Sequence, residues 1–219
     1  MTVLAVIQAR MSSRRCPGKV LAEIGGRPLL ALLVARLRRA RRLDRLVVAT
    51  TTGPADDPVA AWAEGNGVNL VRGPEDDVLT RYVQVVALFP ARVVVRVTAD
   101  NPFTDPLLFD TTVEVMESGG FDYVHMPEAP LGSAVDAFSH TALWRCHREG
   151  WTAYQREHIN AYVLDHAPLF RIGRAAPPLV RPDLRLTVDT PDDLAAARRL
   201  ADRLPDPVTA SLHDLAAAS

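Results

Sequence analysis

The sequence predicts an α/β fold with a mostly parallel central sheet. Short runs rich in β-branched residues alternate with longer amphipathic segments along the chain, which is the pattern of strand and helix units that form a parallel sheet. Residues 92–98 (RVVVRVT) are the most strand-like run and are expected to lie centrally. No internal repeat or low-complexity linker divides the 219 residues, so a single domain is predicted over 1–219.

The first half of the chain contains strands and helices in regular alternation. Apolar runs predict strands over 3–8, 46–50, 68–71 and 92–98. Helical periodicity predicts helices over 29–43, 58–65 and 78–89, and Pro28 suits the start of the first one. Because ligands of parallel sheets bind at the carboxyl ends of the strands, chemistry is expected in the polar loops that follow them.

The second half continues this alternation with one irregular stretch. Helices are predicted over 107–118, 140–149, 154–165 and 190–203, a strand begins at 123–124, and another covers 184–188. Residues 126–132 contain two prolines and are predicted to form an irregular loop. Thr190 is the predicted N-cap of the last helix and Asp193 stands at capping-box spacing, so Asp192 and Asp193 are assigned to structure.

Composition excludes several classes of protein. The 25 Lys and Arg residues balance the 26 Asp and Glu residues, so no overall charge favours a nucleic-acid partner. The two cysteines, Cys16 and Cys146, are too few for a disulfide framework or a cysteine-built metal site. No apolar run is long enough to cross a bilayer and the first apolar segment lacks a preceding basic stretch, so a cytoplasmic protein without a membrane partner is expected.

The loop after the first strand has the composition of a phosphate-binding loop. Residues 8–19 (QARMSSRRCPGK) combine four cationic side chains with two hydroxyls and a glycine. Cations offset the charge of a triphosphate, hydroxyls supply hydrogen bonds, and glycine permits close backbone approach. The loop has neither Walker A spacing nor the glycine pattern of a dinucleotide fold, which indicates another nucleotide-binding fold. On composition alone, a solvated basic loop remains the alternative.

The string VIQARMSSRRCPGKVL resembles the opening motif of the cytidylyltransferase family, which includes CMP-KDO synthetases, CMP-sialic acid synthetases and spore-coat polysaccharide synthesis proteins. The resemblance continues in family order through LVVATTTGPADDPV, VNLVRGPEDDVLTRY, VVVRVTADNPFTDP, YQREHINAYV and LTVDTPDDL. It implies a nucleotide-diphospho-sugar transferase fold (GT-A-like, Rossmann-like) with three layers. It also implies Mg²⁺-dependent transfer of CMP from CTP to a sugar acid, sugar phosphate or polyol phosphate, with release of pyrophosphate.

The same resemblance assigns the phosphate and metal positions. Arg10, Arg15 and Lys19 are expected on the CTP phosphates, with the hydroxyls of Ser12 and Ser13 beside them. Asp100 and Asp189 are the family's metal positions, and each directly follows a predicted strand. Mg²⁺ commonly takes one or two protein carboxylates. Asp100 also suits a turn in Ala-Asp-Asn-Pro, which is the alternative. The expected catalytic residues are Arg15, Lys19, Asp100 and Asp189.

The nucleoside and acceptor positions are less constrained. By resemblance, Thr50, Asp77 and Arg81 lie near the cytidine, although Asp77 also suits a helix N-terminus that pairs with Arg81. The acceptor is expected within 123–178, which is also the candidate dimerisation region of a homodimer. Relatives usually carry Gly-Leu-Asp-Val-Glu-Val-Phe where this chain has GSAVDAF, so the identity of the acceptor stays open. The expected acceptor-binding residues are Asp136, Arg156, Glu157 and His158.

Two other functions remain open at this point. A glycosyltransferase uses the same fold to bind a nucleotide sugar through metal and carboxylates, and a fold alone does not determine function. A nucleic-acid binder is suggested by the arginines of 36–42, which are instead expected to form a solvated face because the net charge is near zero. These arginines are Arg36, Arg38, Arg39, Arg41 and Arg42.

Overall fold

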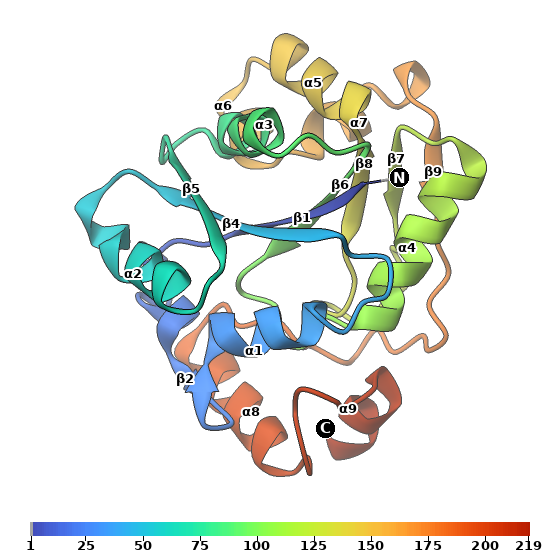
Figure 1. Ribbon diagram of the computed structural model, residues 1–219. Helices are drawn as coiled ribbons and strands as arrows, with labels where there is room; N and C mark the ends of the chain where they lie inside the picture. Colours follow the sequence, from blue (N-terminus) through green and yellow to red (C-terminus); the bar gives the residue numbers. More distant parts are fainter. Residues whose placement is uncertain (1) are drawn as a thin grey trace.

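A seven-stranded sheet runs through the middle of the molecule in the computed structural model, which describes residues 2–219 (Figure 1). The strand order is β5-β4-β1-β6-β8-β7-β9, and only β8 runs against the others. The predicted α/β fold with a mostly parallel sheet is therefore confirmed. The strands are β1 (Val3–Gln8), β4 (Arg45–Thr51), β5 (Asn69–Gly73), β6 (Val93–Thr98), β7 (Tyr123–His125), β8 (Asp136–Ser139) and β9 (Ile172–Arg174).

Helices cover both faces of the sheet and give the molecule three layers (Figure 1). One face carries α3 (Val78–Leu88), α5 (His140–Glu149), α6 (Ala153–Glu157) and α7 (Ala161–Asp165). The other carries α1 (Leu29–Leu37), α2 (Asp57–Gly65) and α4 (Pro106–Gly119), with α8 (Pro191–Asp202) and α9 (Leu212–Ala218) beyond α1. The described residues also contain a small hairpin of β2 (Glu23–Ile24) and β3 (Arg27–Pro28), and the 3₁₀ helices η1 (Lys19–Leu21), η2 (Pro54–Asp56) and η3 (Ala167–Leu169).

The sheet divides the core into two clusters. Val3, Ala5 and Ile7 of β1 pack on the α1 side, and Leu4 and Val6 pack on the α3 side. A strand that is buried on both faces needs apolar residues at every position, which is why β1 reads as a continuous apolar run. This burial holds β1 rigidly between β4 and β6, so the polar residues after it start from a fixed point.

Most predicted elements are present with their ends shifted by at most two residues. The helix predicted over 29–43 is an exception, because it ends at Leu37. Asp110 of α4 accepts hydrogen bonds from the backbone N–H groups of Arg41 and Arg42, at 3.0 and 2.9 Å, and holds that segment in a turn. The hairpin, β8, β9 and α9 were not predicted.

Arg36 corrects the prediction of a solvated arginine face. Its side chain is fully buried, and its guanidinium donates to the carbonyl oxygens of Thr104 (3.1 Å), Pro207 (2.6 Å) and Ala210 (2.9 Å). Burial lowers the pKa of Arg36 to about 10, so it remains charged at neutral pH. The prediction was wrong here because the carbonyl oxygens that accept hydrogen bonds from Arg36 lie far away in the sequence.

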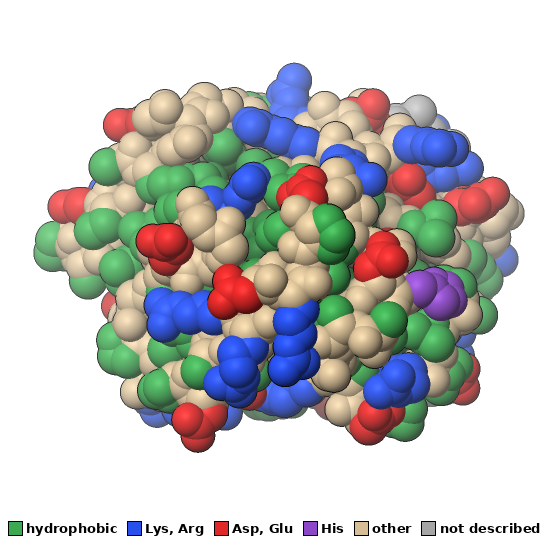
Figure 2. All heavy atoms as spheres, turned by 90° about the horizontal axis from the view of Figure 1, so that it is seen from below, with side chains coloured by type: hydrophobic (Ala, Val, Ile, Leu, Met, Phe, Trp, Pro, Cys, Tyr) green, Lys and Arg blue, Asp and Glu red, His purple; other side chains and the backbone are tan. Residues whose placement is uncertain are grey.

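Seen from below α8 and α9, the surface carries basic and acidic side chains interspersed with apolar ones (Figure 2). Several arginines of the predicted solvated stretch have specific partners, since Arg42 pairs with Glu117 at 2.8 Å and Arg39 donates to the carbonyl of Val208 at 2.9 Å.

Among residues 2–219, no helix combines the length and apolarity that crossing a bilayer requires.

The helix predicted over 154–165 is broken into α6 and α7. A capping box formed by Thr152 and Gln155 starts α6, and the backbone turns extended at His158 (φ −105°, ψ 92°) before α7 begins. Helical periodicity continues across this break, so the pattern alone does not reveal it. The break matters because it brings Glu157 and His158 to the end of a short helix.

The strand predicted over 184–188 is also corrected. This segment is extended, but it forms only an isolated bridge, between Leu131 and Arg185. Its Val188 N–H donates to the carbonyl oxygen of Asp100 at 2.8 Å. Residue 189 therefore reaches the edge of the sheet beside Asp100 without belonging to the sheet.

Candidate active site

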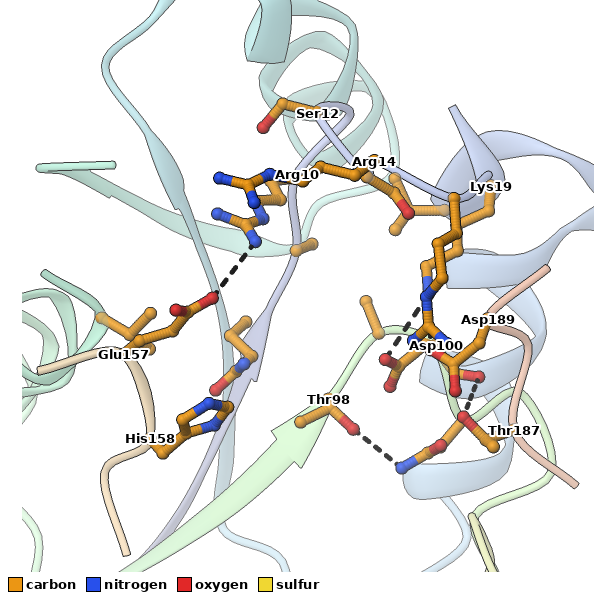
Figure 3. A pocket seen from close by; sticks show the side chains of 18 of the residues that line it. Arg10, Ser12, Arg14, Lys19, Thr98, Asp100, Glu157, His158, Thr187 and Asp189 are labelled. Atoms are coloured by element: carbon orange, nitrogen blue, oxygen red, sulfur yellow. Dashed lines mark hydrogen bonds and ion pairs between the residues drawn. The ribbon is translucent and has the colours of Figure 1, made fainter. Parts of the chain in front are cut away.

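A cleft of about 1000 Å³ opens at the carboxyl ends of β1 and β6. The loop after β1, the loop after β6, the end of α6 and the 187–189 segment line it (Figure 3). This is the edge at which parallel sheets bind ligands. Of the predicted site residues, the following line the cleft: Arg10, Ser12, Ser13, Arg15, Lys19, Arg81, Asp100, Glu157, His158 and Asp189.

Lys19 lies at the centre of one wall of the cleft. Gly18 takes a left-handed conformation (φ 74°), which only glycine adopts readily, and the turn starts η1 at Lys19. The Lys19 side chain is largely buried, and its Nζ donates to the carbonyl oxygen of Val188. The same Nζ lies 3.5 Å from Asp100 Oδ2 and 3.5 Å from Asp189 Oδ1. The basic loop and the two predicted metal carboxylates therefore meet at one point.

The donor set at this point has the chemistry that Mg²⁺ prefers. Asp100 and Asp189 supply carboxylate oxygens that flank a single cationic atom, and both side chains are partly exposed to the cleft. Mg²⁺ completes an octahedron with phosphate oxygens and water around one or two such carboxylates. Within residues 2–219 there is no group of three or more His, Cys, Asp or Glu with metal-binding geometry. The pair Asp100 and Asp189 thus fits a cation that also binds a phosphate ligand.

Asp189 is held by arginines on both of its oxygens. Arg185 Nη2 lies 2.7 Å from its Oδ2, and Arg15 Nη2 lies 2.9 Å from its Oδ1. Asp193 accepts the backbone N–H of Asp189 at 2.9 Å and forms the predicted capping box with Thr190. Although partial burial opposes ionisation, the hydrogen bonds from Arg185 and from these backbone amides hold the pKa of Asp193 below its usual range.

The opposite wall carries Arg10 and the end of α6. Arg10 Nη2 lies 3.5 Å from Glu157 Oε1, and Figure 3 shows this pair on the far side of the cleft from Lys19, with His158 next to Glu157. Ser12 donates from its hydroxyl to Glu75 at 2.8 Å. The two walls therefore differ. One carries Lys19 between two carboxylates, and the other carries the pair of Arg10 and Glu157 beside His158.

Four of the predicted residues lie outside the lining of the cleft, namely Thr50, Asp77, Asp136 and Arg156. Asp77 caps α3, accepting the backbone N–H of Thr80 at 2.8 Å, and Arg156 pairs with it at 3.5 Å. Thr50 is fully buried in β4, and its hydroxyl has no hydrogen-bond partner among the described residues. Asp77 and Arg156 link α3 to α6, so they affect the cleft through the position of α6.

Arg81 and Asp136 also make contacts that support the structure around the cleft. Arg81 donates to the carbonyl oxygens of Pro74 and Glu75 rather than pairing with Asp77, and burial lowers its pKa. It fixes the loop between β5 and α3 that faces the cleft. Asp136 lies beneath the lining and pairs with Arg96 at 3.2 Å.

Sequence reasoning missed several residues that line the cleft and one, Asp56, that supports it from outside the lining. Arg96 and Thr98 share one face of β6 because side chains alternate along a strand, and this spacing was available as a signal. Asp56 is buried and accepts the backbone N–H of Met11 at 2.6 Å, which fixes the start of the basic loop. No sequence pattern distinguished Asp56 from an exposed acidic residue at the start of a helix. The cleft also includes Gln8, Asn101 and Thr187.

Comparison with known proteins gives consistent matches. A family model described as Cytidylyltransferase matches residues 4–213. The spore coat polysaccharide biosynthesis protein SpsF of Bacillus subtilis is 36% identical over 205 residues, covering 90% of this chain and 85% of that protein. The structure of a cytidylyltransferase from Leptospira borgpetersenii matches with a TM-score of 0.94 at 27% identity, covering 99% of this chain and 93% of that one. A CMP:2-keto-3-deoxy-manno-octonic acid synthetase solved with CTP shares the fold, with a TM-score of 0.72, 20% identity and coverage of 93% and 100%.

Proposed function

The chain belongs to the cytidylyltransferase family and is a nucleotidyltransferase, and on that premise we propose that it transfers CMP from CTP to a sugar acid or sugar phosphate with the help of Mg²⁺. The observation that carries the proposal is the meeting of Lys19, Asp100 and Asp189 at one point of the cleft. A cationic loop beside paired carboxylates suits a triphosphate and its counter-ion.

In this proposal the loop after β1 binds the triphosphate. Arg10, Arg15 and Lys19 offset the phosphate charges, and the hydroxyls of Ser12 and Ser13 add hydrogen bonds. Lys19 is held by the Val188 carbonyl, so its ammonium group is already positioned before the nucleotide enters. Preorganised charge of this kind needs no reorganisation during the reaction.

The proposed reaction is an in-line displacement. An acceptor oxygen forms a bond to the α-phosphorus, the bond from that phosphorus to the leaving oxygen breaks, and pyrophosphate departs with the electron pair while the acceptor proton passes to solvent. Asp100 and Asp189 would hold Mg²⁺ beside the phosphates. When bound, that ion supplies positive charge to the phosphates and lowers the pKa of the attacking hydroxyl.

The acceptor is proposed to bind on the wall formed by β6 and the end of α6. Glu157 and His158 line the cleft there, while Asp136 pairs with Arg96 and Arg156 ties α6 to Asp77 at the start of α3. The α6 part of this wall lies within the region 123–178, whereas β6 precedes that region. A homodimer formed through 123–178 stays a prediction.

The test is pyrophosphate release from each of the four nucleoside triphosphates, with Mg²⁺ and a panel of 2-keto sugar acids, sugar phosphates and polyol phosphates. The expected result is release from CTP that depends on the acceptor. Asp100→Asn and Asp189→Asn should each lower kcat/KM by on the order of 10²-fold or more, because each removes a carboxylate that would hold Mg²⁺ beside the phosphates.

Asp192→Asn is the matched control, because Asp192 is exposed at the start of α8 close to Asp189 and should leave turnover unchanged. Full activity in both Asp100→Asn and Asp189→Asn would contradict the assignment of the carboxylates. Release of a nucleoside diphosphate from a nucleotide sugar, without pyrophosphate release from CTP, would instead indicate a glycosyltransferase.

A further inference from the structure

Arg96 is a cation of the cleft that the proposed reaction has not used. It lies on β6 with Thr98, one strand repeat apart and on the same face, and both line the cleft. Arg96 lies about 7 Å along the strand from Thr98, on the side away from the loop that carries Asp100. Its side chain retains 22% exposure, so it reaches the cleft from a mostly buried position.

The guanidinium of Arg96 has more donors than protein partners. Its Nη1 lies 3.2 Å from Oδ2 of Asp136, its neighbour in register on β8. Its Nε is buried without a hydrogen-bond partner among the residues that the structure describes. A guanidinium has five N–H donors in a planar fork, and donors removed from water without partners are costly.

The counter-charges of this wall are already engaged. Asn160 donates from its Nδ2 to the same Oδ2 of Asp136 that Arg96 contacts, at 3.5 Å. Glu157 pairs with Arg10 at 3.5 Å. Position 134 is alanine and supplies no carboxylate. Burial opposes the charge of Arg96, but the attraction of Asp136 together with that of Tyr82, Tyr123 and Asp100 outweighs it and raises the pKa of Arg96, so Arg96 stays charged.

We propose that Arg96 is a specificity-determining residue that binds an anionic group of the acceptor, a carboxylate or a phosphate, away from the oxygen that attacks CTP. This inference rests on the proposed function and assigns the two anions of the reaction to different cations. The triphosphate faces Lys19 and Arg15, and the acceptor anion faces Arg96 on the wall beside His158. An acceptor without that anion leaves the guanidinium partly desolvated and unpaired, so it binds more weakly.

The experiment measures KM for the acceptor and KM for CTP in wild type, Arg96→Gln and Arg96→Lys. Each acceptor is paired with a neutral analogue, namely a 2-keto sugar acid with its methyl ester and a sugar phosphate with the free sugar. Arg96→Gln should raise the acceptor KM by about 10- to 100-fold, because a hydrogen bond to a charged group is lost, while KM for CTP changes less than about twofold. Arg96→Lys should restore part of the affinity, since it keeps the charge but loses the planar fork.

The two acceptor pairs distinguish the sources of the anion. If Arg96→Gln raises KM for the sugar acid but not for its methyl ester, the anion bound by Arg96 is a carboxylate. If the variant raises KM for the sugar phosphate but not for the free sugar, the anion is a phosphate. Equal penalties on charged and neutral acceptors, or an equal rise in KM for CTP, would overturn the inference. If Arg96→Gln does not fold, Arg96→Lys decides, because it should weaken binding of the charged acceptor relative to its neutral analogue without raising KM for CTP. Wild type that releases no pyrophosphate from CTP with any acceptor would contradict the proposed function itself.

Discussion

Asp189 shows how a single carboxylate is oriented by its neighbours. Its Oδ1 lies 2.9 Å from Arg15 and 3.5 Å from Lys19, and its Oδ2 lies 2.7 Å from Arg185. Arg185 also donates to Asp193 at 3.0 Å, which ties it to the start of α8. The Oδ1 side faces the cleft because Arg185 engages the other oxygen, so Arg185 is a positioning residue.

Arg185→Gln is therefore expected to lower kcat/KM by about 10- to 100-fold, since a small misplacement of a reacting group is this costly. Steady-state kinetics at varied Mg²⁺ concentration would measure the effect, and the Mg²⁺ requirement should rise with it. Arg181→Gln is the matched control, because Arg181 is similarly exposed and pairs with Asp183 at 2.7 Å away from the cleft. Equal losses in both variants would mean that the effect is not specific to Asp189.

At the scale of elements, the basic loop depends on η2 for its shape. Asp56 at the end of η2 is buried and accepts hydrogen bonds from the backbone N–H of Met11 and from the hydroxyl of Thr51 at the end of β4. Gly18 donates its N–H to the carbonyl of Met11 at 3.0 Å. The start of the loop, its last turn and the neighbouring strand are thus joined at Met11 and Asp56.

Asp56→Asn should raise KM for CTP about tenfold and destabilise the fold by about 1–3 kcal/mol, because an amide NH₂ would face donors and leave one of them unpaired. Urea unfolding and kinetics at saturating acceptor measure the two effects separately. Asp57→Asn is the control, since Asp57 is exposed and pairs with Arg72 at 2.8 Å on the surface. An Asp56→Asn enzyme with unchanged KM for CTP would contradict a role for this contact in shaping the loop.

At the scale of the whole molecule, Arg36 joins the first helix to distant parts of the chain. It contacts the loop before α4 through Thr104 and the segment before α9 through Pro207 and Ala210. Asp105 lies 3.9 Å from its Nη2. The C-terminal segment therefore packs on α1 through a buried, hydrogen-bonded cation as well as through apolar contacts.

Arg36→Met should lower the free energy of unfolding by about 3–5 kcal/mol, because it removes the cation that faces the buried carboxylate of Asp105 and leaves the carbonyls of Thr104, Pro207 and Ala210 without their donor. Arg39→Met is the control, since Arg39 is exposed and makes one bond to the carbonyl of Val208. Chemical denaturation monitored by circular dichroism measures both. A loss no larger than that of Arg39→Met would show that the Arg36 contacts add little to stability.

The sequence by itself determined the α/β fold, most of its helices and strands in their order, and the family. Strand and helix patterns depend on burial that repeats every two or 3.6 residues, and the motif strings need no structure to be recognised. The basic loop and Asp100 were predicted for the same reason, because each directly follows a strand whose apolar run is unmistakable.

Only the tertiary structure decided which side chains of these motifs meet. Asp189 reaches Lys19 from a segment that is not a strand, the break at His158 turns Glu157 into the cleft, and Arg81 binds backbone carbonyls instead of Asp77. Charged side chains choose partners by proximity in space, since electrostatic and hydrogen-bond energies depend on distance and burial and not on sequence spacing. The sequence therefore predicted the edge of the sheet that carries the chemistry, and packing determined the partners within it.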